Sequence, residues 1–146
     1  LQAHGVNVAL GTNGSASNNA LDMLAELRLA ALLAKGSSND ASVVPASQAL
    51  AMATLNGARA LGIDNKVGSI EPGKQADLIA IDLEHPRTQP VYDPCSTLTY
   101  SAAASQISHV WVDGQALVVN HQLTRMDLAQ VLEEARRWGA GIAAGA

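Results

Sequence analysis

Large aromatic side chains are almost missing from this sequence. Phenylalanine is absent, and aromatic residues make up only 3% of the 146 residues. The chain is nevertheless 48% hydrophobic, so alanine and leucine must supply most of the apolar volume of a core. These residues favour helices, whereas an aromatic-rich β-sandwich needs rings that the sequence lacks.

Cysteine and positive charge are also scarce, and each absence excludes a class of partner. The single cysteine, Cys95, allows no internal disulfide and builds no zinc site, so we expect a small structural residue in a turn. The net charge of −4 leaves no basic face for a nucleic acid. No apolar stretch spans a membrane and no signal peptide opens the chain, so we expect a cytoplasmic protein without a membrane partner.

The first 62 residues predict one strand followed by helices. Residues 6–10 form a short β-branched run typical of a buried strand, and the polar residues 12–19 predict a loop. Asn19 is expected to cap a helix that Gly36 stops. Two shorter helices are expected, one over 46–54 and one capped by Asn56 and ended by Gly62. This order resembles a βα unit of a barrel or a doubly wound sheet.

The rest of the chain predicts strands and then a last helix. Residues 67–70 and 76–81 are expected to be extended, with a turn at 71–74 between them. Asp113-Gly114 lies between two apolar runs and predicts a hairpin. Thr124 is expected to cap a helix that frays after Trp138. Because the sequence opens at Leu1, without methionine, we expect a fragment of a longer chain.

Several motifs give the sequence a family likeness. Residues 68–79 read G-S-I-E-P-G-K-Q-A-D-L-I, residues 8–19 read V-A-L-G-T-N-G-S-A-S-N-N, and residues 51–62 form an intervening helical step. Together they resemble the amidohydrolase superfamily, and most of all its 5′-methylthioadenosine/S-adenosylhomocysteine deaminase subgroup, which is triazine hydrolase-like.

The resemblance implies an α/β fold in three parts. Residues 1–62 are expected to be the last strand and helices of a TIM-type barrel. Residues 63–123 are expected to be most of a composite β-sandwich domain, and residues 124–146 a C-terminal helix and tail. The barrel prediction depends on residues 6–10 pairing with strands that lie outside this sequence.

The resemblance also implies metal chemistry at the mouth of the barrel. Family members hold zinc or another divalent metal with an H-x-H pair, two more histidines and an aspartate that ends strand eight, and metal-bound hydroxide attacks the substrate. Only the last position is present here, and it is Asn13. Asn13 is therefore the candidate catalytic residue and an altered metal-ligand position, because a neutral carboxamide is no useful base.

Four explanations for Asn13 remain open: an engineered change, natural divergence, a sequence ambiguity, or deamidation at the Asn13-Gly14 pair that returns an aspartate. Ser15, Ser17 and Asn18 are candidate substrate contacts, although small polar residues also suit a tight loop. The histidines show no metal-ligand spacing, and we expect structural or surface roles for all four: His4, His85, His109 and His121.

The sequence thus predicts the C-terminal segment of a metal-dependent aminohydrolase for methylthioadenosine- or S-adenosylhomocysteine-type substrates. The isolated chain is expected to bind no metal and to be inactive. Its expected partners are the N-terminal barrel segment of the same enzyme, a small-molecule substrate and, once complete, further copies of itself. The alternatives are a metal-free structural or interaction module of the same fold, and a triazine or other nucleobase hydrolase.

Overall fold

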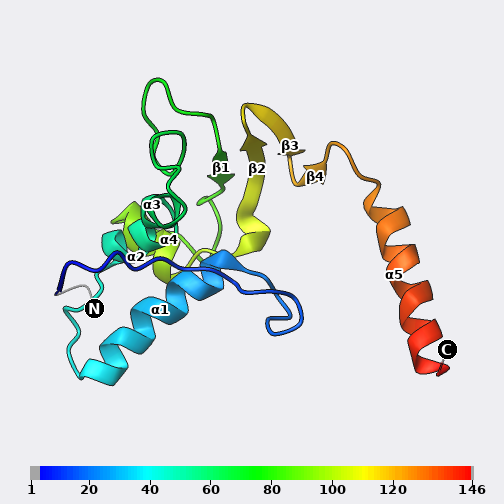
Figure 1. Cartoon of the computed structure of the whole chain (residues 1–146), viewed down its shortest axis with the longest axis horizontal. Coiled ribbons are helices and arrows are strands. Elements are labelled where there is room, and N and C mark those ends of the chain that lie inside the picture. Colours follow the sequence, from blue (N-terminus) through cyan, green and yellow to red (C-terminus); the bar gives the residue numbers. More distant parts are fainter. Residues whose placement is uncertain (1–3, 146) are drawn as a thin grey trace.

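The structure of the chain is a computed structural model, and it describes residues 4–145. Within them, helices form one layer: α1 (Met23–Ser38), α2 (Ala46–Met52), α3 (Leu55–Ala60) and α4 (Pro94–Tyr100). The other layer is an antiparallel sheet in the order β1-β2-β3-β4, whose first strand precedes α4 in the chain: β1 (Leu78–Ile81), β2 (Ile107–Val112), β3 (Gln115–Val119) and β4 (Gln122–Leu123). The 3-10 turn η2 (Ala104–Gln106) leads into β2, and helix α5 (Leu128–Ala143) extends away from the body (Figure 1).

The core is built from small and aliphatic side chains, as the composition predicts. Leu24, Leu27 and Ala31 of α1 pack with Ala49 of α2 and with Ala102, which follows α4. Leu27 is only 1% exposed, and three of these five residues are alanines. Because alanine side chains are small, the backbones of α1, α2 and α4 can approach closely, and the aromatic ring that packs against this cluster, Tyr100 of α4, is only partly buried.

Helix α1 begins and ends later than predicted. Its cap is Asp22, whose carboxylate accepts hydrogen bonds from the backbone N–H groups of Leu24 (2.9 Å) and Ala25 (3.2 Å). The helix passes through Gly36 and ends at Asn39, which takes the left-handed conformation with φ +52°. Asparagine tolerates that conformation, so it replaces the glycine that the prediction used as a stop.

The strand predicted over residues 6–10 does not form among the described residues. The segment is extended, but it pairs with no strand, and Val6 is 47% exposed. Its inner end is held by a hydrogen bond of 2.9 Å from the backbone N–H of Leu10 to the carbonyl of Met52. A strand needs a neighbour for its ladder, so the barrel segment stays a prediction that the pairing of residues 6–10 does not support.

The hairpin predicted at Asp113-Gly114 is confirmed. Both turn residues have positive φ, +50° and +74°, as a two-residue hairpin turn requires. Val112 pairs with Gln115 across the turn, and β2 continues the ladder on its other side with β1. The strand predicted over 76–81 is shorter, and residues 67–70 form no strand, so residues 4–145 contain one sheet of the expected sandwich.

Helix α4 was not predicted, and it corrects the expectation for Cys95. The carboxylate of Asp93 caps the helix by accepting a hydrogen bond of 2.9 Å from the backbone N–H of Ser96. Hydrogen bonds from the Ser96 hydroxyl and backbone hold the pKa of the Asp93 carboxyl below its usual range. Cys95 therefore lies half-buried in the first turn of a helix rather than in a loop turn.

Helix α5 also differs from its prediction at both ends. Asp127, not Thr124, is the cap and accepts hydrogen bonds from the N–H groups of Ala129 and Gln130. The helix continues beyond Trp138 to Ala143 instead of fraying. No helix within residues 4–145 has the length and apolar character needed to cross a lipid bilayer.

The two candidate caps of α1 make a matched stability test. Replacing Asp22 by alanine is expected to lower the free energy of unfolding by about 1 kcal/mol, because two backbone donors lose their acceptor. Replacing Asn19, for which the structure gives no capping bond, should change it far less. Urea unfolding followed by circular dichroism measures both, and equal losses would contradict the observed cap.

Candidate functional site

Asn13 lies in an exposed loop directly after the extended segment 6–10. Its backbone is left-handed, with φ +60°, and its side-chain Oδ1 accepts a hydrogen bond of 2.8 Å from the backbone N–H of Gly14. The hydroxyl of Thr12 donates to the Asn13 carbonyl at 3.1 Å. The carboxamide is thus held by its own loop, with its side chain at the surface of the described residues.

The three candidate substrate contacts have different local roles. Ser17 closes the loop, since its hydroxyl and its backbone N–H both donate to the Gly14 carbonyl, at 3.1 and 3.0 Å. Asn18 ties the loop to helix α1 by donating to Glu26 Oε1 at 2.7 Å, and its Oδ1 accepts from two following backbone N–H groups. Ser15 is exposed and has no such bond within residues 4–145. Ser15 is therefore the serine of this loop that is left available to a ligand.

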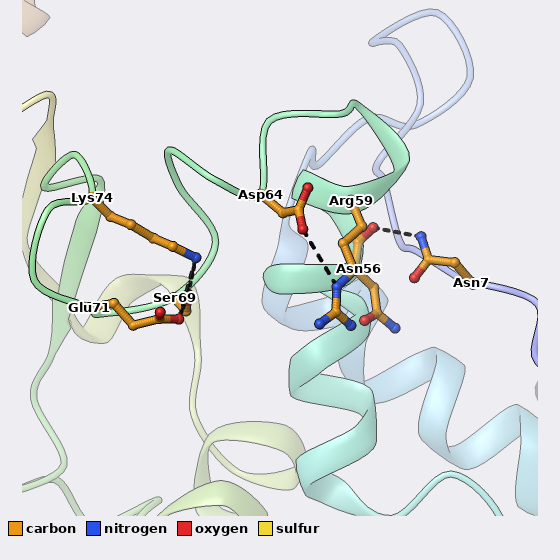
Figure 2. Close-up of polar contacts among 7 residues, drawn as sticks. All are labelled: Asn7, Asn56, Arg59, Asp64, Ser69, Glu71 and Lys74. Carbon is orange, nitrogen blue, oxygen red and sulfur yellow. Dashed lines mark hydrogen bonds and ion pairs between the residues drawn. The ribbon is translucent and has the colours of Figure 1, made fainter.

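Asn56 clamps the segment before the loop, a role that the sequence prediction missed. Asn7 donates from Nδ2 to the Asn56 carbonyl at 3.0 Å, and Asn56 donates from Nδ2 to the Val8 carbonyl at 3.0 Å. Figure 2 shows the first of these contacts between the extended segment and helix α3. The predicted role of Asn56 as a helix cap is wrong, because its side chain bonds 48 residues away in sequence.

The described residues do not by themselves fit the metal that the family likeness implies. No group of three or more histidine, cysteine, aspartate or glutamate side chains within residues 4–145 is arranged to hold an ion. Asn13 offers one neutral oxygen, already bonded to the Gly14 N–H. The histidines lie elsewhere: His109, for example, stacks on Trp111 with ring centroids 5.3 Å apart. A complete metal site would need ligands from other residues.

An apolar groove lies among the residues that the structure describes, and Asn13 is not one of the residues that line it. It measures about 630 Å³ and is walled by α2, α3, the loop 61–70 and strand β1. Three of its wall residues are strongly exposed: Ile70 (87%), Leu61 (75%) and Ile79 (53%). Few polar groups converge there, so the groove has the character of an unfilled packing surface rather than of a catalytic pocket.

The turn at residues 71–74 fixes one wall of that groove. Lys74 Nζ donates to the Ser69 hydroxyl at 2.6 Å and lies 3.4 Å from Glu71 Oε1, as Figure 2 shows. The Ser69 hydroxyl donates to the same carboxylate. The Ser69 hydrogen bond, followed by Lys74, holds the pKa of the Glu71 carboxyl below its usual range. This cluster explains why polar residues surround Pro72-Gly73 in the motif that carries the family likeness.

The Asn13-Gly14 pair is expected to deamidate on ageing at neutral pH. The unhindered Gly14 nitrogen attacks the Asn13 side-chain carbonyl carbon and expels ammonia, and water opens the resulting succinimide to aspartate or isoaspartate. The 2.8 Å contact between that nitrogen and Asn13 Oδ1 holds the reacting groups close in an exposed loop.

A second Asn-Gly pair in the chain provides the control for deamidation. Asn56-Gly57 lies inside helix α3, and its carboxamide is engaged with Val8. Peptide mapping by mass spectrometry of aged protein should find the modification at Asn13 well before Asn56. An unmodified Asn13 peptide, or equal rates at both sites, would rule the prediction out.

Comparison with known proteins identifies the relatives of this chain. The sequence profile of the amidohydrolase family matches residues 1–117. A 5-methylthioadenosine/S-adenosylhomocysteine deaminase from Teredinibacter turnerae is 49% identical over 138 residues, which are 94% of this chain and 31% of the relative. A 5'-deoxyadenosine deaminase from Methanosarcina acetivorans is 46% identical over 132 residues, which are 90% of this chain and 30% of the relative. The chain spans about a third of the length of these relatives.

Solved structures agree with the sequence matches. An adenosine deaminase from Xanthomonas campestris with bound zinc gives a TM-score of 0.95 at 47% identity, covering 99% of this chain and 33% of that one. An atrazine chlorohydrolase from Arthrobacter aurescens complexed with zinc gives 0.85 at 32% identity, covering 93% of this chain and 30% of that one. The predicted α/β fold and the likeness to these enzymes are confirmed. In sequence and in structure, the chain belongs to the amidohydrolase family.

Proposed function

We propose that this chain is the C-terminal segment of an aminohydrolase that deaminates 5′-methylthioadenosine, S-adenosylhomocysteine or a related 5′-substituted adenosine. The observation that carries the proposal is the 49% identity, over 94% of the chain, to a deaminase named for the first two substrates. The 5'-deoxyadenosine deaminase supports the same substrate class, since it too is named for an adenosine altered at the 5′ position.

Within that enzyme, we assign the loop 12–19 to the edge of the substrate site. We assign Asn13 to the position where the family carries its strand-eight aspartate, and Ser15 is an exposed serine whose side chain makes no hydrogen bond within residues 4–145. Ser17 and Asn18 stay candidate substrate contacts, and their side chains also shape the loop by bonding to Gly14 and Glu26. We keep the division into 1–62, 63–123 and 124–146 as the barrel segment, the sandwich segment and the terminal helix.

The catalytic metal, zinc or another divalent ion, is proposed to be held mainly by ligands outside these 146 residues, with Asn13 at the one altered ligand position within them. Support comes from the zinc in two similar structures and from the lack of an ion-binding cluster within residues 4–145. When bound, such an ion lowers the pKa of a coordinated water. The isolated chain is therefore proposed to be inactive.

The missing partner is proposed to be the N-terminal segment of the same enzyme. Two open surfaces support this proposal: the extended segment 6–10, which has no strand partner among the described residues, and the apolar groove beside β1. Exposed apolar surface of this kind marks a site of association. The further association of complete copies into a homo-oligomer stays a prediction.

A chimera tests the function. The part of the Xanthomonas campestris adenosine deaminase that precedes the matched third is joined to residues 1–146 of this chain, and its zinc content and ammonia release from 5′-methylthioadenosine are measured. We expect zinc binding and weak ammonia release by the chimera, and neither by the 146-residue chain alone. Zinc binding without ammonia release, even after Asn13 is changed to aspartate, would reject the proposed function.

The metal-free structural module remains the second candidate because of one observation, the neutral side chain of Asn13. In that case the 146-residue chain should be stable and monomeric on its own, and the chimera should release no ammonia. A triazine substrate is the third candidate, supported by the similarity to the atrazine chlorohydrolase, and the same chimera can be given atrazine.

A further inference from the structure

Helix α5 is an amphipathic helix whose apolar face covers nothing within the described residues. It extends away from the body (Figure 1), and none of its residues is buried. Its large apolar side chains are all substantially exposed: Leu128 (55%), Val131 (46%), Leu132 (45%), Trp138 (72%) and Ile142 (73%).

These side chains share one face of the helix. Leu128, Val131, Leu132 and Ala135 follow the i, i+3, i+4, i+7 spacing of a single apolar stripe, and Trp138 and Ile142 extend it. The charged residues Glu133, Glu134, Arg136 and Arg137 lie outside that stripe. A 16-residue helix is marginal in water without tertiary packing, so this stripe requires a partner.

The placement of α5 is shared with a solved structure of a longer chain. The Xanthomonas campestris deaminase matches 99% of this chain with a TM-score of 0.95. Because the 16 residues of α5 are more than a tenth of the chain, that score would not be reached if α5 were displaced. In that deaminase, the other two thirds of the polypeptide are also present. They can contact the apolar face of α5, which the matched third leaves exposed.

A second copy of α5 is too small a partner. A helix of 16 residues is about 24 Å long. A contact about 24 Å long and about 10 Å wide, the width of a helix, covers on the order of 500 Å² on the two helices together, less than the ~1,200 Å² at the lower end of stable interfaces. A covalently linked segment offers a larger surface at high effective concentration.

We infer that α5 is a docking helix whose apolar face packs on the N-terminal two thirds of the same polypeptide. This inference rests on the proposed function, since it takes the chain to be the last third of a deaminase. It goes further because α5 lies beyond residue 117, where the match to the family profile ends. The helix fastens the last third of the enzyme to the part that supplies the metal ligands.

Hydrogen exchange of the α5 amides tests the inference in the chimera described above. In the free 146-residue chain, α5 should exchange rapidly, because its helix has no tertiary packing. In the chimera, the amides of residues 128–143 should exchange slower by roughly a hundredfold or more, because packing now opposes opening of the helix.

Two neighbouring substitutions separate docking from helix formation. Trp138→Gln removes the largest side chain of the apolar face and should abolish most of the added protection in the chimera. Arg137→Gln places the same residue on the charged side and should leave the protection unchanged. In the free chain, both variants should exchange as the parent does.

The possible outcomes are distinct. Equal exchange of α5 in the chimera and the free chain overturns docking, and so does protection of the free chain that rises with its concentration, which identifies a second copy as the partner. Deamination without protection rejects docking alone, whereas protection without deamination rejects the proposed function alone. A chimera that stays insoluble where the parent deaminase is soluble counts against both.

Discussion

Replacing Asn13 by aspartate in the chimera is expected to raise the rate of ammonia release by about a hundredfold or more, the range that a positioned acid–base group contributes. An ionised carboxylate accepts a proton and carries a negative charge, whereas a carboxamide at neutral pH does neither. The exposed loop tolerates the change, because aspartate adopts the left-handed backbone of residue 13 almost as readily as asparagine does.

The matched control is Asn120→Asp, the same change of charge at an asparagine with a similar left-handed backbone, φ +49°, between β3 and β4. Asn120 is exposed and lies outside the loop 12–19, so the rate of this variant should stay within a factor of about two of the parent, in line with the small effect of a solvent-screened surface charge. Initial rates of ammonia release at saturating 5′-methylthioadenosine measure both variants. If the two variants give the same rate, residue 13 lies outside the site, and the family position assigned to it is wrong.

Features that depend on neighbours in sequence were predicted well. The Asp113-Gly114 hairpin follows from two adjacent residues whose positive φ suits only one kind of turn. The alanine and leucine core follows from composition, since no other apolar residues are plentiful. The turn at 71–74 is likewise local, with Gly73 at φ +93°.

Features that depend on distant residues were predicted poorly. Residues 6–10 carry the pattern of a strand, but that pattern cannot show whether a pairing strand is present in the same chain. The role of Asn56 was missed because its partner, the Val8 carbonyl, lies 48 residues away. The hydrogen bond from Asn18 to Glu26 was not predicted, because it depends on where helix α1 lies, while the expected substrate contact of Asn18 stays a prediction.

Helix starts were displaced because several residues of the right type lay close together. Asn19 and Asp22 are both good caps, and propensity does not rank one clearly above the other. The same ambiguity applies at α5, where Thr124 was the predicted cap and Asp127 is the observed one. Helix α4 was missed altogether, because its seven residues include the buried Thr97 and Thr99, which do not mark an apolar face.

Replacing Gly68 by alanine is expected to be the most damaging small change outside the core. A Cβ at this position would lie 2.7 Å from the Cβ of Ala58 and 3.1 Å from the Cα of Leu55, both in helix α3. The backbone there also has φ +94°, which strains any side chain. Overpacking adds about 1–3 kcal/mol to the strain of about 1–2 kcal/mol from the left-handed backbone. Urea unfolding of the chimera measures the loss.

A substitution at Gly73 separates the backbone strain from the overpacking. The φ of Gly73, +93°, matches that of Gly68, while a Cβ there would meet nothing within 4 Å. Gly73→Ala should therefore show the backbone strain alone, about 1–2 kcal/mol. Combining Gly68→Ala with Ala58→Gly removes the 2.7 Å clash, so the double variant should be more stable than the sum of the two single losses. Equal losses at Gly68 and Gly73 would show that the close approach to α3 is unimportant. The expected difference explains the motif physically: its first glycine lets the loop 61–70 lie against α3 as a wall of the apolar groove, and its second allows the turn to reverse.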